Sequence, residues 1–226
     1  IGLMFGLLII VLATITFVVF IERAQRRLLV QYPKRQVGNK MFGGDNSHLP
    51  LKLNTSGVIP AIFASSLLLM PITIANFSSG QGPDWVNSIT TLLGRGQPLY
   101  MIIYASLIVF FCYFYTAIVF NPEDTADNLK KQGGFIPGIR PGERTAQYID
   151  FVLTRLTVVG SIYLVLVCLL PEFLISRFAV PFYFGGTSVL IIVNVAMDTM
   201  TQFQGYLFAH QYEGLLKKSK LGSRKR

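Results

Sequence analysis

The chain has 226 residues, of which 52% are hydrophobic and 14% charged, whereas about 25% of the residues of an ordinary soluble domain are charged. This composition argues against a soluble globular protein. A formal net charge of +9 can indicate binding to nucleic acid or to anionic lipid, or it can set the orientation of a membrane protein. The distribution of the basic residues along the chain distinguishes these meanings. The two cysteines, Cys112 and Cys168, lie inside apolar runs without metal-ligand spacing, so neither a disulfide nor a metal site is predicted.

Apolar segments long enough to cross a hydrocarbon core of about 30 Å dominate the chain. The predicted transmembrane spans are residues 1–21, 57–77, 99–120, 149–170 and 182–208. The charged residues near the first segment follow it, which is not the order of a signal peptide. We therefore interpret residue 1 as an internal position of a longer chain.

Basic residues alternate between the connections. Eighteen of the 20 Lys and Arg lie in the loop 22–54, in the loop 121–148 with the stretch that follows it, and in the tail 209–226; only Arg95 and Arg177 lie in the loops 78–98 and 171–181. By the positive-inside rule, the rich side is cytoplasmic and the poor side external. A unit with an odd number of spans would have to be inverted relative to its partner half in a duplicated transporter.

The two basic loops carry signals of ordered structure. Residues 28–32 and 49–53 flank a glycine-rich stretch and predict a β-hairpin with Pro50 at an edge. Asn121 and Pro122 predict the start of a short helix, and the glycine pair at 133–134 its end. In the following run, two Pro-Gly pairs hold Arg140 on a stiff turn. Long ordered loops are commonly functional.

The sequence contains few residues in patterns that are typical of catalytic sites. The two histidines, His48 and His210, have no metal-ligand spacing, and no nucleophile or phosphate-binding motif is present. We predict that the chain is not an enzyme and takes no cofactor. Ser65 and Ser66 in the second span indicate either close helix packing or a mobile helix that lines a path. The basic loops and tail indicate orientation and anionic lipid contact, or binding of a partner.

Several runs resemble the C-terminal half of the bacterial SecY family, spans six to ten of ten. They are residues 54–66 (NTSGVIPAIFASS), 120–142 (FNPEDTADNLKKQGGFIPGIRPG) and 181–188 (PFYFGGTS), together with the arginine-rich stretches 22–27 and 32–36. The resemblance implies an all-α membrane protein with five transmembrane helices and a cytoplasmic β-hairpin, forming one half of an inverted-repeat ten-helix channel. Such a channel in the bacterial plasma membrane passes unfolded polypeptides across, and releases hydrophobic segments sideways into lipid.

The resemblance also implies partners and site residues. The partners are SecE-type and SecG-type small membrane subunits, the SecA motor ATPase, the ribosome with its exit-tunnel RNA, and polypeptides with signal sequences. Ile62 and Ile191 match the pore ring, where an aliphatic ring excludes ions by dewetting. Ser65 and Ser66 match the lateral gate, and Arg140 matches the arginine on which SecA-driven transport depends. The other basic positions expected to bind cytoplasmic partners are Arg23, Arg26, Arg27, Lys34, Arg35, Lys130 and Lys131.

Two other classes of function stay open at this stage. A secondary transporter for a small solute would need paired intramembrane charges or unwound helix ends at a midplane site, and the sequence shows neither clearly. A membrane scaffold without a pore would need only the spans themselves.

Overall fold

The computed structural model describes residues 2–37, 40–42, 44, 46–77, 84–94, 96–178 and 185–223. Helices account for most of them, and two short pairs of strands follow the first helix. The elements are α1 (Gly2–Arg23), β1 (Gln25–Gln31), β2 (Arg35–Val37), β3 (Lys40–Phe42), β4 (Asn46–Lys52), α2 (Ile59–Phe77), α3 (Asp84–Leu92), α4 (Pro98–Val119), α5 (Pro122–Lys131), α6 (Glu143–Phe178) and α7 (Gly186–Ser223).

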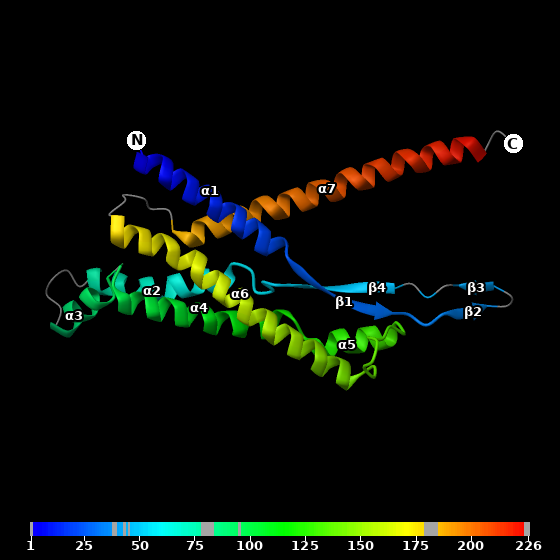
Figure 1. The fold of residues 1–226 in the computed structure, drawn as a ribbon, viewed down its shortest axis with the longest axis horizontal. Coiled ribbons are helices and arrows are strands. Elements are labelled where there is room, and N and C mark those ends of the chain that lie inside the picture. The colour runs from blue at the N-terminus through cyan, green and yellow to red at the C-terminus, as the bar shows by residue number, and fades with distance from the viewer. Residues whose placement is uncertain are drawn as a thin grey trace.

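The long helices run broadly along the longest axis of the molecule, and α1 and α7 cross each other (Figure 1). Contacts join α2 to α4, α4 to α6, α6 to α7, and α7 to α1. The N-terminus and α3 lie at one end, whereas the strands, α5 and the C-terminal part of α7 lie at the other, which we call the hairpin end. The connections rich in Lys and Arg therefore gather at one end of the molecule.

Four of the described helices, α1, α2, α4 and α6, are long and apolar enough to cross a membrane. The fifth predicted span, 182–208, begins outside the described residues. Its helix α7 is interrupted by polar residues such as Asn194 and Asp198, so its membrane crossing stays a prediction. The predicted fold class, a mostly helical membrane protein with a small hairpin, is confirmed.

Several helices extend beyond the predicted spans. The 36 residues of α6 measure about 54 Å, well over the roughly 30 Å of a hydrocarbon core. Its first turns lie in the predicted loop 121–148. Helix α7 continues through most of the predicted tail, and α3 occupies part of the predicted loop 78–98, where the sequence analysis assigned no helix. Because helix ends need not coincide with membrane boundaries, the limits of the spans stay predictions.

Two hydrophobic cores hold these elements together. The larger one, the bundle core, lies among the long helices and includes Ala61, Ile108, Leu164 and Leu190, which are fully buried. Helix α1 contributes one buried residue, Val18, and most of its other side chains are exposed. The second core lies at the hairpin end.

Candidate functional site

One face of α2 is exposed and carries Ile62 and Ser66, whereas the third predicted site residue of this helix, Ser65, is half-buried. Ile62 is 38% exposed, although its neighbour Ala61 is fully buried in the bundle core. Ser65 and Ser66 each donate a hydroxyl hydrogen bond to the carbonyl oxygen of Ile62, at 2.9 Å. Because residues four apart share a helix face, Ile62 and Ser66 belong to one exposed stripe. The hydroxyl hydrogen atoms of both serines are thus used within α2.

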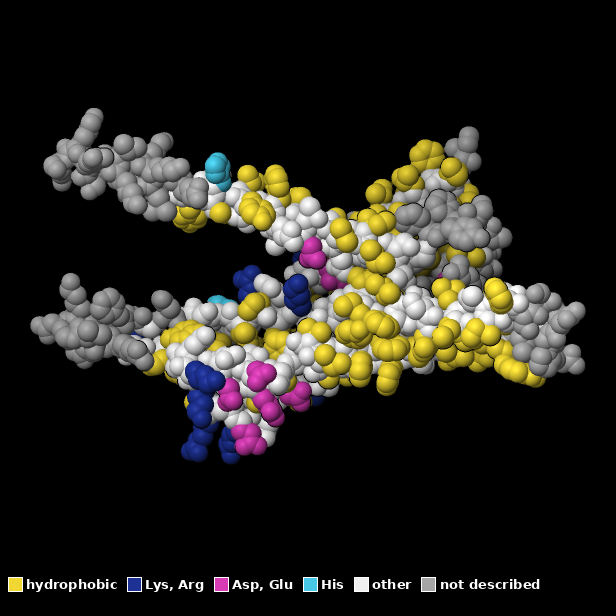
Figure 2. Space-filling model, turned by 180° about the vertical axis from the view of Figure 1, so that it is seen from behind, with side chains coloured by type: hydrophobic (Ala, Val, Ile, Leu, Met, Phe, Trp, Pro, Cys, Tyr) yellow, Lys and Arg dark blue, Asp and Glu magenta, His cyan; other side chains and the backbone are white. Residues whose placement is uncertain are grey.

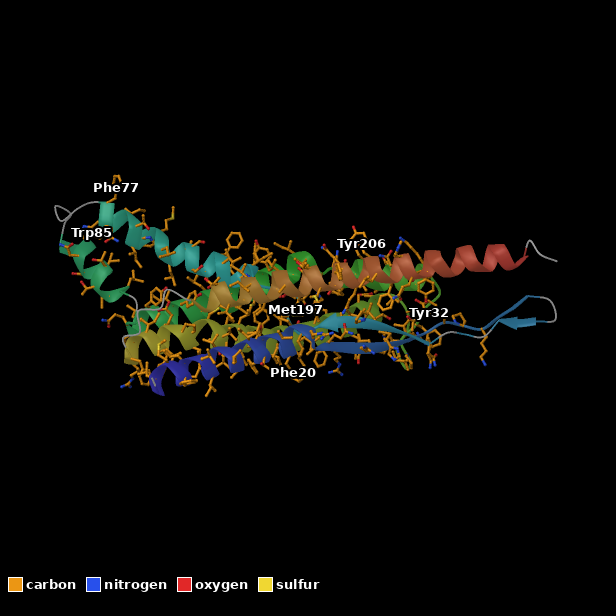
Figure 3. The ribbon with its side chains drawn as sticks, turned by 90° about the horizontal axis from the view of Figure 1, so that it is seen from above. Phe20, Tyr32, Phe77, Trp85, Met197 and Tyr206 are labelled. Atoms are coloured by element: carbon orange, nitrogen blue, oxygen red, sulfur yellow. The ribbon has the colours of Figure 1, made fainter. Side chains whose placement is uncertain are left out.

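Ile191 has a similar setting on α7. It is 40% exposed, whereas Leu190 beside it is fully buried and Val193 is nearly so. Neither Ile191 nor Ile62 belongs to the bundle core, although the residues next to both of them do. In Figure 3, Met197 marks the part of α7 that lies by α1, whereas Tyr206 lies farther out on the same helix. The two predicted pore residues are thus presented by packed helices without being buried by them.

At the hairpin end, the second core is built from segments far apart in the sequence. Strand β1 pairs antiparallel with β4, with Leu28 opposite Leu49 and Leu29 opposite His48. Since alternate side chains point to opposite faces, Leu28 and Val30 are buried while Leu29 is exposed. We call the buried set the hairpin-end core; it comprises Leu28, Val30, Leu51, Leu129, Ile136, Ile149, Val152 and Leu156.

Helix α5 is fixed at both ends by local hydrogen bonds. The side chain of Asn121 accepts a hydrogen bond from the backbone N–H of Glu123, and Pro122 occupies the first turn. At the other end, Gly133 has φ +76°, and Gly134 donates to the carbonyl of Leu129. This is the Schellman arrangement, which favours glycine in the left-handed conformation. The predicted capping of this helix is confirmed.

The segment after α5 is anchored on the hairpin by its backbone. Gln31 and Phe135 exchange two hydrogen bonds, both of 2.9 Å. A side chain on Gly134 would start 3.0 Å from both the Tyr32 ring and Val30, so glycine permits this close approach. Tyr32 lies beside the hairpin strands in Figure 3, at the opposite end of the molecule from Phe77 and Trp85.

Arg140 is exposed on a turn whose flanks are buried or tied down. The N–H of Ile139 donates to the carbonyl of Ile136, and Gly138 between them has φ +83°, as in a type II turn with Pro137 at its second position. Ile136 is buried in the hairpin-end core and Ile139 packs against it. The Thr145 hydroxyl donates to the carbonyl of Arg140 at 2.9 Å. The backbone under Arg140 is therefore held in one geometry while its guanidinium is exposed.

The remaining predicted basic residues lie at the same end but do not form one cluster. Figure 2 shows Lys and Arg side chains in two groups there, one in the notch beneath α7 and one beside acidic side chains. All of those whose side chains the structure describes are exposed: Arg23, Arg26, Arg27, Lys34, Lys130 and Lys131. The Arg35 side chain lies outside the described residues. Exposed Lys and Arg side chains spread over a broad surface can neutralise several negative charges at once, which suits binding of a phosphate-rich or acidic partner.

A polar junction that the sequence alone did not predict lies where the hairpin meets the long helices. The buried Asn54 donates to Glu22 Oε1 at 2.8 Å and to the carbonyl of Gly57 at 3.1 Å. Tyr163 of α6 donates to the same oxygen of Glu22 at 3.3 Å. A side chain on Gly160 would start 2.7 Å from the carbonyl oxygen of Leu53. This junction fixes the hairpin to α1 and α6, and no local pattern marks its partners.

Among the residues that the structure describes, no three His, Cys, Asp or Glu side chains are grouped as metal ligands would be. The chain is thus a multi-spanning α-helical membrane protein with exposed apolar helix faces and an ordered basic region at one end.

Comparisons with known proteins agree with this class. The SecY family model matches residues 1–200, so the chain belongs to the SecY family. It is 58% identical over 211 residues to the protein translocase subunit SecY of Rickettsia bellii, and 58% identical over 214 residues to that of Escherichia coli K12. The matches cover 93% and 94% of this chain but 48% of each relative, so the chain spans about half the length of these relatives.

Solved structures show the same fold. One is described as the structure of a protein conducting channel and matches with a TM-score of 0.57 at 20% identity, covering 86% of this chain and 48% of that one. Another concerns the plug domain of the SecY protein and matches with a TM-score of 0.56 at 18% identity, over the same shares. At these identities the likeness supports the fold alone.

Proposed function

We propose that the chain forms the C-terminal half of the pore subunit of a Sec protein-conducting channel. The channel passes unfolded polypeptides across the bacterial plasma membrane and releases hydrophobic segments sideways into lipid. The observation that carries this proposal is the exposure of Ile62 and Ile191 beside fully buried neighbours, in a chain that belongs to the SecY family.

In this proposal, Ile62 and Ile191 line the constriction of the pore. An aliphatic ring excludes water and ions without directional bonds, so it can yield around any passing sequence. Ser65 and Ser66 belong to the lateral gate. Their hydroxyls are satisfied by the carbonyl of Ile62, and α2 can therefore face either lipid or a polar chain without leaving a donor unpaired.

The hairpin end is the cytoplasmic side and the docking region for the driving partners. Arg140 contacts the SecA motor, and the basic residues of the hairpin and α5 neutralise ribosomal RNA or anionic lipid. The exposed positions of these residues support this role, as does the excess of Lys and Arg in the connections at this end. SecE-type and SecG-type subunits complete the assembly. The chain itself supplies a passive path with no catalytic site.

The test replaces Ile62 and Ile191 with glycine, singly and together, in the full-length channel subunit that carries this sequence. Reconstituted in planar bilayers, the double variant is expected to conduct ions at rest, and in cells it should export a reporter with a defective signal sequence. Ile162→Gly, on an exposed position of α6, is the matched control for loss of helix propensity. Unchanged conductance together with unchanged signal-sequence demand would refute the pore and favour a scaffold.

A further inference from the structure

The first turn of α7 lies unusually close to α6. A side chain on Gly186 would start 2.7 Å from Cα of Cys168 and closer still to the carbonyl oxygen of Val167. Both obstacles are backbone atoms of buried residues of α6, so they cannot move aside as the end of a flexible side chain could. Glycine at this position therefore allows α7 to begin in direct contact with α6.

A hydrogen bond between helices lies next to this contact. The hydroxyl groups of Tyr104 on α4 and Thr187 on α7 are 3.2 Å apart. Tyr104 is 4% exposed and its ring stacks on that of Tyr100, which limits its orientation. The buried side chain of Cys168 on α6 lies beside both hydroxyls. Three helices thus meet at the start of α7, and we call this group the α7 joint: Tyr104, Cys168, Gly186 and Thr187.

The α7 joint stands one helical turn before Ile191. Ile191 lies four positions after Thr187, a rise of about 6 Å along the same helix face. Leu190 and Val193 continue the packed face of α7, whereas residues 198–212 are all exposed. The described side-chain packing of α7 is therefore concentrated in its first turns. A small rotation at the joint would turn the Ile191 side chain directly.

We propose that the hydrogen bond between Tyr104 and Thr187 is a positioning contact that sets the rotation of α7 and so holds Ile191 in the closed constriction. The inference rests on the proposed pore. In it, Tyr104 and Thr187 do not touch the translocating chain. They bias the equilibrium between closed and open arrangements, and they make the channel demand a functional signal sequence before it opens.

The test compares Thr187→Val and Tyr104→Phe, alone and combined, in the full-length channel subunit with its small membrane partners. Each substitution removes a hydroxyl with little change of shape. We expect each to raise export of a reporter with a defective signal sequence roughly threefold to tenfold, the range set by one interhelical hydrogen bond. Export with an intact signal sequence should be unchanged. The double variant should equal the single ones, because both break the same bond.

Two matched variants isolate the hydrogen bond. Thr187→Ser retains the hydroxyl and should behave as the unsubstituted protein. Thr199→Val removes a hydroxyl of the same helix that donates to the carbonyl of Val195, and it should also leave signal-sequence demand unchanged. A rise in Thr199→Val equal to that in Thr187→Val would overturn the assignment to the α7 joint.

Other outcomes also count against the proposal. Unchanged signal-sequence demand in both hydroxyl variants refutes it, and so do additive effects. An equal loss of export with intact and defective signals would show a merely structural role. Ile191→Gly, measured in parallel, separates the two proposals. If it relaxes signal-sequence demand while Thr187→Val does not, the joint is wrong and the pore stands; if it also has no effect, the pore itself fails.

Discussion

At the hairpin end, side chains from β1, β4, α5 and α6 share one core, whereas most of α1 and one face each of α2 and α7 are exposed. Helix α6 takes part in both arrangements. Ile149 in its first half lies in the hairpin-end core, and Leu164 in its second half lies in the bundle core. The contrast is clearest between Ile149, which is fully buried, and Ile62, which is 38% exposed.

This difference separates two ways in which a residue can matter. At the hairpin end, buried apolar side chains and backbone hydrogen bonds fix the position of a few exposed charges, so function depends on the core beneath them. On the exposed helix faces, a side chain contributes little to the stability of this chain, and its identity is free to serve another purpose.

The largest expected effect is on transport when Arg140 changes sign. Arg140→Glu should lower SecA-driven export at least about tenfold, as expected for the loss of a fixed charged contact. The new carboxylate would lie on the same rigid turn and repel the acidic group that the guanidinium is proposed to contact. The membrane fold should be intact, since the guanidinium is exposed and the turn is held by Ile136, Ile139 and Thr145. Export into vesicles at fixed motor concentration, with circular dichroism of the purified channel, gives both readouts.

Arg144→Glu is the control for the charge change, because Arg144 is also exposed but lies within the regular helix α6 rather than on the turn. It should reduce export much less. Normal motor-driven export by Arg140→Glu would refute the role assigned to this residue. An equal loss of export in both variants would show that only the net charge of this region matters, and not the position of Arg140.

The second prediction compares one residue type in the two environments. Ile149→Ala should lower the free energy of unfolding by about 2–5 kcal/mol, because it leaves a cavity in the hairpin-end core. Ile62→Ala should change it by no more than about 0.5 kcal/mol, as usual for an exposed site. Thermal unfolding of the detergent-solubilised channel and limited proteolysis at the hairpin end measure the difference.

The transport readout should show the opposite order. Ile62→Ala should raise ion leakage at an unchanged unfolding midpoint, whereas Ile149→Ala should leave resting conductance alone. If Ile62→Ala destabilises the protein as much as Ile149→Ala does, then Ile62 is a packing residue in the complete assembly, and the division between the two regions fails.

Local signals were sufficient to predict much of this molecule. Apolar length gave the long helices, the glycine-rich stretch between two apolar strands gave the hairpin, and the cap and glycine signals gave the ends of α5. Each depends on residues close together in the sequence. Arg140 could be singled out for the same reason, because the Pro-Gly pairs that fix its turn lie on either side of it.

Contacts between distant residues could not be predicted this way. Tyr163 reaches Glu22 across 141 positions, and Tyr104 meets Thr187 across 83. These pairs have no periodicity and no required spacing, since the chain path between them sets their geometry. The same holds for Gly186, whose need for a small side chain arises from Val167 and Cys168 of another helix.

The smallest effect should follow from loss of the cap on α5. Asn121→Ala removes the side-chain acceptor for the N–H of Glu123 and the hydrogen bond that Asn121 donates to Asp124. Such a loss costs about 1 kcal/mol of helix stability. A loss of about 1 kcal/mol should lower the protection of α5 amides from hydrogen exchange about fivefold. Helix α5 should nevertheless stay folded, because its Leu129 is part of the hairpin-end core.

Asn128→Ala, at an exposed position of the same helix, is the matched control and should leave that protection nearly unchanged. The exposed stripe of α2 should be unaffected by either variant, with resting conductance at its original value, because the hairpin end and the exposed faces of α2 and α7 are held by different cores. A change in conductance on loss of the Asn121 cap would show that the two regions are coupled through α6, the helix that both cores share.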